Sequence, residues 1–185
     1  MKIFKHFLLM SAVAGSLMLG SCTKDPVTSN TTSGNTGRIV CKLNGASWSS
    51  DAQDKYYYLK SDTLVGTSAV LSNGELIVQG TRVLTGDTST IVIQLVLTPA
   101  KTGKYEGTFS TSAADGALYI PNRNFIDLLQ IAMTYTNTYS VTLTKVDETN
   151  KKVSGVFSIN MKAPAGAGKP DYIVTEGSFT DLTLR

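Results

Sequence analysis

The chain has 185 residues, with 17 lysines and arginines, 14 aspartates and glutamates and a single histidine. This length fits one domain with a substantial core, and a formal charge of +3 gives no field strong enough to predict a nucleic-acid partner. The only histidine, His6, lies within the first ten residues. The rest of the chain therefore excludes Ser-His-Asp and Cys-His catalysis, histidine metal sites and acid–base chemistry by histidine.

The first 21 residues have the organisation of an export signal. Lys2, Lys5 and His6 form a basic start, and residues 7–19 (FLLMSAVAGSLML) are uncharged and mostly apolar. This block is shorter than the roughly 20 residues of a transmembrane helix, and polar residues follow it at once. We therefore predict a cleaved signal peptide over residues 1–21. Its removal leaves 15 basic and 14 acidic residues, so the mature chain is nearly neutral.

Small residues follow the apolar block, in the order Leu19-Gly20-Ser21-Cys22. This stretch resembles the lipobox of bacterial lipoproteins. The resemblance implies cleavage before Cys22 and attachment of fatty acyl chains such as palmitate to that cysteine, and two or more chains anchor a protein stably to a bilayer. It thus implies a lipid-anchored protein of the bacterial cell envelope, with the outer membrane as the expected location. Lys24 and Asp25 leave the periplasmic and the surface face both open.

Residues 22–37 (CTKDPVTSNTTSGNTG) follow the signal and are short, polar and interrupted by proline and glycine. This composition is typical of a flexible tether, here one that begins at the lipidated cysteine. Residues 38–185 form the remaining segment, which we predict to be a single β domain. Threonine occurs 24 times in residues 22–185, and its branched side chain favours pleated sheets.

Alternation of apolar and polar residues recurs along this domain. Tyr139–Val146 and Val153–Lys162 both alternate and are separated by a short polar stretch, which predicts a hairpin. Further tight turns are predicted at Asn44-Gly45, Asn73-Gly74 and Asp115-Gly116. Only residues 124–133 (NFIDLLQIAM) carry a helical signal, and their second half also alternates as a strand. About nine or ten strands with little helix predict an all-β fold, an antiparallel β-sandwich or a barrel-like sheet.

One short pattern, G-x-F-[ST], occurs three times, at residues 107–110, 155–158 and 177–180. Glycine and phenylalanine stand two residues apart, so they share one face of a strand. A glycine there allows a neighbouring aromatic ring to lie across the backbone, or permits a bulge. The alternation changes phase after Phe179, which predicts a bulge near Thr180-Asp181. We interpret the pattern as a packing device.

Three segments of the domain carry a second resemblance: KLNGASWSS (42–50), KVDETNKKVSGVFSI (145–159) and VTEGSFTDL (174–182). They resemble segments of an uncharacterised family of small β-sandwich lipoproteins from Bacteroidota. The resemblance spans most of residues 38–185 and implies a β-sandwich exported to the cell envelope. It implies no catalytic residues, because none are established for that family.

Most familiar catalytic and metal-binding patterns are missing. Cys41 alternates with Ile39 and Leu43 on one strand face, so we interpret it as a small buried hydrophobic residue rather than a reactive thiol. Ser21 and Lys24 form the only S-x-x-K pair, and the predicted cleavage separates them. The GAGK stretch at residues 166–169 lacks the first glycine and the Ser/Thr of a phosphate-binding loop.

Carboxylates leave one chemistry open. Residues 62, 87, 147 and 148 are acidic and lie near turns, but their spacing is not that of a calcium loop, and we predict no metal and no cofactor. Glycoside hydrolysis needs only two carboxylates at a set separation, so 14 acidic residues neither support nor exclude it. Asp62-Thr63-Leu64 resembles the pattern that Bacteroidota O-glycosylate on exported proteins, which makes Thr63 a candidate modification site.

Aromatic side chains gather at Trp48 and at Tyr56-Tyr57-Tyr58. Rings presented on a sheet can stack on sugars, so these four residues are the candidate ligand-binding side chains. On a strand Tyr56 and Tyr58 share one face and Tyr57 takes the other. The alternative is that Trp48 and at least one tyrosine fill the core, since large aromatic side chains are mostly buried.

Three classes of function remain after these exclusions. We expect a cell-envelope lipoprotein whose β-sandwich is a non-catalytic module that binds a ligand or partner, such as a glycan or an envelope protein. The alternatives are a structural accessory of an outer-membrane complex and a carboxylate-based hydrolase. We expect no nucleic-acid partner, because the mature chain is nearly neutral.

Overall fold

The computed structural model describes residues 37–53, 56–59, 62–84, 87–97, 102–109, 115–121 and 134–185. For residues 56–59, 62–65 and 87 it describes the backbone alone. The chain divides into two units, 1–30 and 31–185, and every described residue lies in the second. The predicted signal peptide, the lipobox and Asn124–Met133 lie outside the described residues.

Twelve strands make up the described part of the chain, and it contains no helix long and apolar enough to cross a membrane. Their bounds are β1 Ile39–Leu43, β2 Ala46–Ser49, β3 Tyr56–Leu59, β4 Asp62–Val65, β5 Thr67–Ser72, β6 Glu75–Leu84, β7 Asp87–Val96, β8 Gly103–Phe109, β9 Gly116–Ile120, β10 Thr136–Asp147, β11 Lys152–Lys162 and β12 Tyr172–Thr183.

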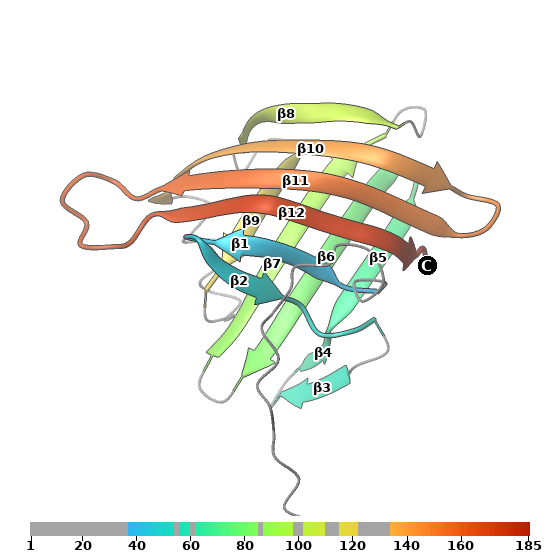
Figure 1. Ribbon diagram of the computed structural model, residues 1–185, viewed down its shortest axis with the longest axis horizontal. Helices are drawn as coiled ribbons and strands as arrows, with labels where there is room; N and C mark the ends of the chain where they lie inside the picture. The colour runs from blue at the N-terminus through green and yellow to red at the C-terminus, as the bar shows by residue number, and fades with distance from the viewer. Residues whose placement is uncertain are drawn as a thin grey trace, which may run out of the picture. The chain divides into compact units, whose positions relative to one another are not determined.

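Ten of these strands form two antiparallel sheets, which confirms the predicted all-β sandwich (Figure 1). The six-stranded sheet has the order β2-β1-β12-β11-β10-β8, and the four-stranded sheet has the order β5-β6-β7-β9. Strands β3 and β4 pair with each other in a separate two-stranded sheet. Strands that follow one another in the chain pair antiparallel here, because most of the connections between them are short turns rather than crossover helices.

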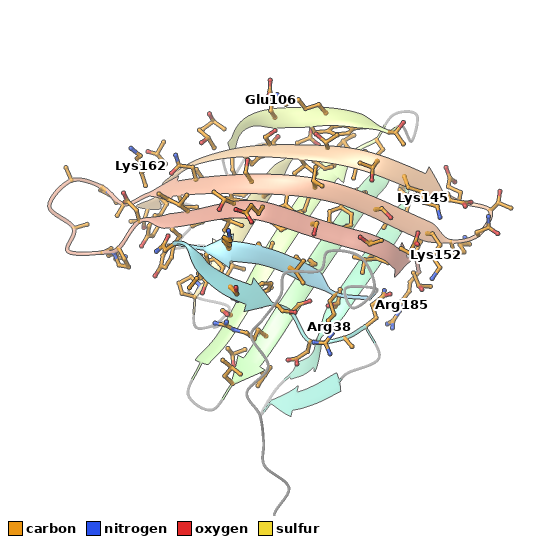
Figure 2. The ribbon with its side chains drawn as sticks, in the orientation of Figure 1. Arg38, Glu106, Lys145, Lys152, Lys162 and Arg185 are labelled. Atoms are coloured by element: carbon orange, nitrogen blue, oxygen red, sulfur yellow. The ribbon has the colours of Figure 1, made fainter. Side chains whose placement is uncertain are left out.

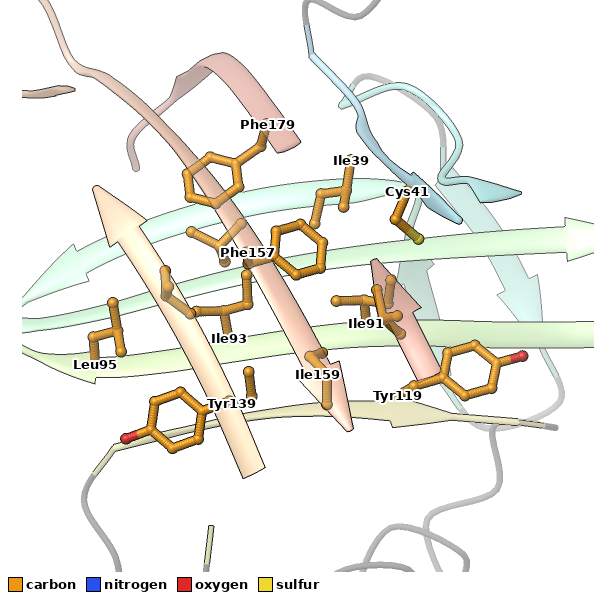
Figure 3. Close-up of a cluster of buried hydrophobic side chains, with 14 of the residues drawn as sticks. Ile39, Cys41, Ile91, Ile93, Leu95, Tyr119, Tyr139, Phe157, Ile159 and Phe179 are labelled. Atoms are coloured by element: carbon orange, nitrogen blue, oxygen red, sulfur yellow. The ribbon is translucent and has the colours of Figure 1, made fainter. Parts of the chain in front are cut away.

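A single hydrophobic core lies between the two large sheets. It receives the inward side chains of alternating strand positions, as the period-two pattern requires (Figure 3). The most deeply buried members include Ile39, Leu76, Ile91, Ile93, Leu95, Leu143, Ile159, Met161, Phe179 and Leu182. Burial of this apolar surface is the main favourable term in folding the sandwich.

Several hydrogen bonds also join the two sheets. The Trp48 Nε1–H on β2 donates to Ser89 Oγ on β7 at 3.0 Å, and Asn137 Nδ2 on β10 donates to the Ala117 carbonyl on β9 at 2.7 Å. At the end of the chain, the Arg185 N–H donates to the Ala69 carbonyl at 3.0 Å, beside a parallel bridge between Ala69 and Leu184. The last residues therefore tie β12 to the edge strand β5.

Two of the three predicted tight turns are confirmed, and so is the predicted hairpin. Asn44-Gly45 joins β1 to β2 and Asn73-Gly74 joins β5 to β6, with positive φ at both residues of each pair, as a type I′ turn requires. Strands β10 and β11 pair as expected, with Tyr139 opposite Ile159 and Val146 opposite Val153.

The prediction of a turn at Asp115-Gly116 is wrong. Gly116 is the first residue of β9 and pairs with Gln94 of β7, and it is not among the glycines with positive φ. Its lack of a side chain serves packing instead, because a Cβ added there would lie 2.0 Å from Cδ2 of Phe109.

Replacing Gly116 with alanine is expected to lower the free energy of unfolding by about 1–3 kcal/mol, because the new methyl group overlaps the Phe109 ring. Urea denaturation measures the change. In a Phe109→Ala background the same substitution should cost much less, since the three heavy atoms nearest to the added Cβ all belong to the Phe109 ring. Gly107→Ala is the matched control, because its nearest contact is the Tyr139 hydroxyl at 3.3 Å. Equal losses in both backgrounds would contradict the clash.

The G-x-F pattern acts as the sequence predicts, and it does so reciprocally between β11 and β12. Gly155 pairs with Phe179, and Phe157 pairs with Gly177, so each glycine faces the aromatic residue of the other strand. A Cβ added at Gly155 would lie 2.6 Å from Cζ of Phe179. The two rings then lie 6.3 Å apart, centroid to centroid. Each ring lies across a bare stretch of backbone, so the two strands can bury both side chains.

The predicted bulge near Thr180-Asp181 is confirmed. The β11–β12 register shifts between Val153 and Gly155, and Asp181 has a positive φ of 49°. The Asp181 N–H donates to Ser154 Oγ at 2.8 Å, which satisfies a backbone group that the bulge removes from the ladder. A second shift follows Phe157, beside Glu176 with a φ of 53°. Each extra residue shifts the alternation by one position, so Val174, Phe179 and Leu182 are all buried in the core.

Candidate functional site

Trp48, one of the four candidate ligand-binding residues, lies in the core. Its side chain is 2% exposed, its Nε1–H donates to buried Ser89, and the Arg82 guanidinium carbon lies 5.6 Å from its ring centroid. Trp48 lies on β2, which pairs with β1 at the edge of the six-stranded sheet. Its neighbours on the strand point outward, because successive side chains of a strand alternate between the two faces. Trp48 is therefore a core residue, as the alternative interpretation of the sequence expected. Its ring offers no face to a ligand in solution.

The three consecutive tyrosines lie on β3, in the small sheet that β3 forms with β4. In the backbone register Tyr56 pairs with Val65, Tyr57 with Leu64 and Tyr58 with Thr63. The alternation of a strand places Tyr56 and Tyr58 on one face and Tyr57 on the other. Their role in ligand binding stays a prediction, as does O-glycosylation at Thr63. The structure does bring Thr63 directly opposite Tyr58, so both predictions concern one hairpin.

Cys41 is a free thiol buried in the core, as the sequence predicts. It lies on β1 opposite Trp48 of β2. Burial raises the pKa of the Cys41 thiol to about 12, and the nearby Arg82 charge opposes this rise only in part. At neutral pH the thiol is therefore fully protonated, which removes it as a nucleophile.

The carboxylates of the described residues hold loops and strands in place. Asp51 accepts from the Val83 N–H at 3.0 Å, Asp171 from the Ala163 N–H at 2.9 Å, and Asp115 accepts from the N–H of Val96. Each of these bonds satisfies a backbone donor next to a strand end.

The remaining described carboxylates mostly pair with side chains. Lys42 and Glu176 form an ion pair at 2.7 Å, Lys145 and Asp181 form one at 3.0 Å, and a third joins Lys104 and Glu106. Glu75 accepts from the side-chain amide of Gln94. Among the described residues, no three cysteine, aspartate or glutamate side chains lie close enough together to hold a metal ion.

The turn between β10 and β11 holds two of the acids that the sequence places near turns. The Asn150 backbone and side-chain amides donate to Asp147 at 2.9 and 2.8 Å. These two hydrogen bonds hold the pKa of the Asp147 carboxyl below its usual range. A carboxyl of this kind stays ionised at neutral pH, so it closes the turn and is a poor general acid.

The outward face of the six-stranded sheet carries many small hydroxyl side chains. Ser140 of β10 lies between Glu106 of β8 and Ser158 of β11, and Thr138 lies between Thr108 and Asn160. Other members of this face are Ser47, Ser49, Thr136, Thr142, Thr175, Ser178 and Thr180. Aromatic residues of the described strands in this sheet point instead to the core side. The face can donate and accept hydrogen bonds over a wide area, but it offers no ring for stacking.

A cluster of three tyrosines (Tyr119, Tyr135 and Tyr172) lies under the loop between β11 and β12. The ring of Tyr172 lies 5.1 Å from that of Tyr119 and 5.8 Å from that of Tyr135, centroid to centroid. The Tyr135 hydroxyl donates to the Pro170 carbonyl at 3.2 Å, and burial raises the pKa of both Tyr135 and Tyr172. The cluster anchors the exposed loop 164–171 to one end of the sandwich.

Sequence reasoning did not find this tyrosine cluster. Its members come from β9, from the residue before β10 and from the first residue of β12, and they are 16 or more positions apart in the chain. No local pattern connects such positions, and only the packing of the two sheets brings them together. The consecutive tyrosines of β3 are dense in sequence, whereas the tyrosines shown in contact are scattered.

In comparisons with known proteins, no family model, no curated protein and no solved structure matches this chain.

Proposed function

We propose that the chain is a lipid-anchored protein of the bacterial cell envelope whose β-sandwich binds a ligand or partner without catalysis. The anchor and the location rest on the lipobox at Leu19–Cys22, and the Bacteroidota lipoprotein family remains the resemblance that fits these features. A flexible tether of the length of residues 22–37 would have a root-mean-square reach of roughly 20 Å, which would let a folded domain stand off the membrane surface.

The proposal that the domain is not catalytic is supported mainly by its carboxylates, which are engaged in structural hydrogen bonds and ion pairs. A glycoside hydrolase needs two carboxyl groups in separate roles, one of them with a raised pKa. Among the described side chains, Asp51, Asp115 and Asp171 bond to backbone donors, and Asp181 and Glu176 pair with lysines. Asp147 has a lowered pKa. Groups engaged in this way favour a scaffold rather than a reaction centre.

The outward sheet face and the β3–β4 hairpin are the surfaces on which binding can take place. The face offers many hydroxyl groups, and the ion pairs Lys42–Glu176 and Lys104–Glu106 neutralise part of its charge, which suits a neutral, polar ligand such as a glycan. The hairpin carries the consecutive tyrosines, the residue type that adds stacking to hydrogen bonding. A glycan is therefore the first ligand class to test, and an envelope protein is the second.

Alanine substitution of the tyrosine that stacks on a glycan is expected to weaken binding by about 0.5–1.5 kcal/mol, or roughly two- to twelvefold. The measurement is a glycan array with the chain that begins at residue 23, followed by titration of each positive glycan. Tyr56→Ala and Tyr58→Ala should act alike because they share a strand face, and Tyr57→Ala on the opposite face is the internal control.

Three outcomes of this experiment are informative. Loss of affinity confined to one face of β3 supports stacking and identifies the face. An array without any bound glycan removes the sugar ligand and leaves the protein partner. Turnover of a polysaccharide, abolished by replacing a single carboxylate, would overturn the non-catalytic function itself.

A further inference from the structure

Strand β8 ends the six-stranded sheet, and its outer edge carries no strand in the described part of the chain (Figure 1). It pairs with β10 along its whole length, from Gly103 opposite Leu143 to Phe109 opposite Asn137. Among the described residues, no backbone hydrogen bond reaches β8 from any other segment. About half of its N–H and C=O groups therefore point away from the sheet, as in any edge strand, and can accept a further strand.

The sequence of this edge is self-complementary about Tyr105. Thr102, Lys104, Glu106 and Thr108 alternate along the strand, so they share its outward face, and all four side chains are exposed. Figure 2 shows Glu106 projecting from β8 at the end of the sheet. In an antiparallel pair centred on Tyr105, Lys104 of one chain faces Glu106 of the other, and Thr102 faces Thr108. Opposite charges and threonine pairs are favourable cross-strand neighbours.

We propose that β8 pairs with β8 of a second copy of this chain, antiparallel and centred on Tyr105, in a two-fold symmetric dimer. Such an interface is isologous, because the same strand serves on both sides. It joins two six-stranded sheets edge to edge. The proposal does not depend on the ligand or on the lipid anchor.

The charges of the edge select this register against its neighbours. A shift of two residues in either direction would place Lys104 opposite Lys104, or Glu106 opposite Glu106. A parallel pair would oppose both like-charged residues at once. A shift of one residue would turn each outward side chain toward the opposite face. Only the arrangement centred on Tyr105 opposes unlike charges twice.

The inward side of the strand fits the same arrangement. Gly103 and Gly107 flank Tyr105 and would lie opposite each other across the two-fold axis. The two Tyr105 residues would lie at the axis itself, and within each chain the Tyr105 side chain packs against the core of its own sandwich.

Within one chain Lys104 and Glu106 already form an exposed ion pair, with Nζ and Oε2 2.5 Å apart. An exposed pair of this kind contributes little to stability, so exchanging it for two pairs across the interface carries a small penalty. The charges can also serve to keep unrelated strands away from the edge. Charge reversal distinguishes a protective edge from a pairing edge.

The experiment measures the oligomeric state of the full-length chain, released from detergent and counted by native mass spectrometry over a series of concentrations. The wild-type chain should form dimers as the concentration rises. Lys104→Glu or Glu106→Lys alone opposes like charges twice, and each should raise the dimer dissociation constant at least about tenfold. The double variant Lys104→Glu/Glu106→Lys restores unlike pairs and should dimerise as the wild type does.

Mixing the two single variants provides the most specific test of the proposed pairing. One carries only acidic and the other only basic residues at these two positions, so an equal mixture should form heterodimers while neither variant dimerises alone. This result also shows that both variants are folded. The matched controls are Lys42→Glu and Glu176→Lys, which reverse an exposed ion pair on β1 and β12 away from the edge. Monomers of the wild-type chain at every concentration, or single variants that dimerise as well as wild type, would overturn the proposal.

Discussion

Replacing Cys22 with alanine is expected to abolish acylation of the chain completely. In the proposed lipoprotein the Cys22 thiol and the amino group freed by cleavage are the attachment points, so the variant has nowhere to carry the lipid. Each buried CH₂ of an acyl chain contributes about 0.8 kcal/mol to membrane binding, and losing the chains should release the protein from the membrane. The measurement is incorporation of labelled palmitate in bacteria that express the full-length chain, with fractionation of the cells.

The matched control for this prediction is Cys41→Ala, because Cys41 is the only other cysteine in the chain. Its thiol is buried on β1 in the core of the sandwich, where neither lipid nor an acylating enzyme can reach it. The Cys41→Ala variant should therefore take up label as well as wild type does. If Cys22→Ala retains the label, the lipobox interpretation is wrong, and the location in the envelope loses its basis.

The sequence predicts strands and turns well in this chain because those signals are local. The β10–β11 hairpin follows from two alternating runs around a short polar stretch, and the bulge at Thr180-Asp181 follows from a change of phase. Asn44-Gly45 predicts its turn because both residues tolerate positive φ. Each of these features is decided by a few consecutive residues.

Features decided by packing between distant segments are the ones that the sequence does not show. Asp115-Gly116 has the composition of a turn, yet Gly116 begins a strand. The glycine is there because the ring of Phe109 occupies the space that a side chain would need. The contacts of Tyr172 with Tyr119 and Tyr135 likewise depend on how the two sheets face each other. A dense aromatic run is conspicuous in a sequence, but density is no measure of exposure.

Burial of the G-x-F phenylalanines shows how a local pattern can still carry long-range information. Gly155 and Phe157 are two residues apart on β11, and the same spacing separates Gly177 from Phe179 on β12. Antiparallel pairing places each glycine opposite the other strand's ring. The third copy ends in Phe109, whose ring lies on Gly116 of the other sheet. The repeated pattern thus predicts that a ring will cross a glycine, whereas the identity of that glycine depends on the fold.

The tryptophan separates the structural and the ligand-binding interpretations most sharply. Trp48→Ala is expected to lower the free energy of unfolding by about 3–5 kcal/mol, the usual cost of removing a large buried aromatic side chain. The ring is 2% exposed and packs in the core cluster, so the surrounding strands can fill the space only in part. Urea denaturation followed by circular dichroism measures the change without using the tryptophan signal.

The Trp48→Phe variant isolates the hydrogen bond from the packing. Phenylalanine keeps most of the apolar contact but removes the Nε1–H that donates to Ser89 Oγ, and Ser89 is itself fully buried. This variant should lose about 1–3 kcal/mol, because a buried polar group loses its partner. Val156→Ala is the control, since Val156 is 49% exposed and should change stability by no more than about 0.5 kcal/mol. If both Trp48 variants keep wild-type stability but lose affinity for a glycan, Trp48 is a ligand contact after all, and its burial between the sheets must be relieved on binding.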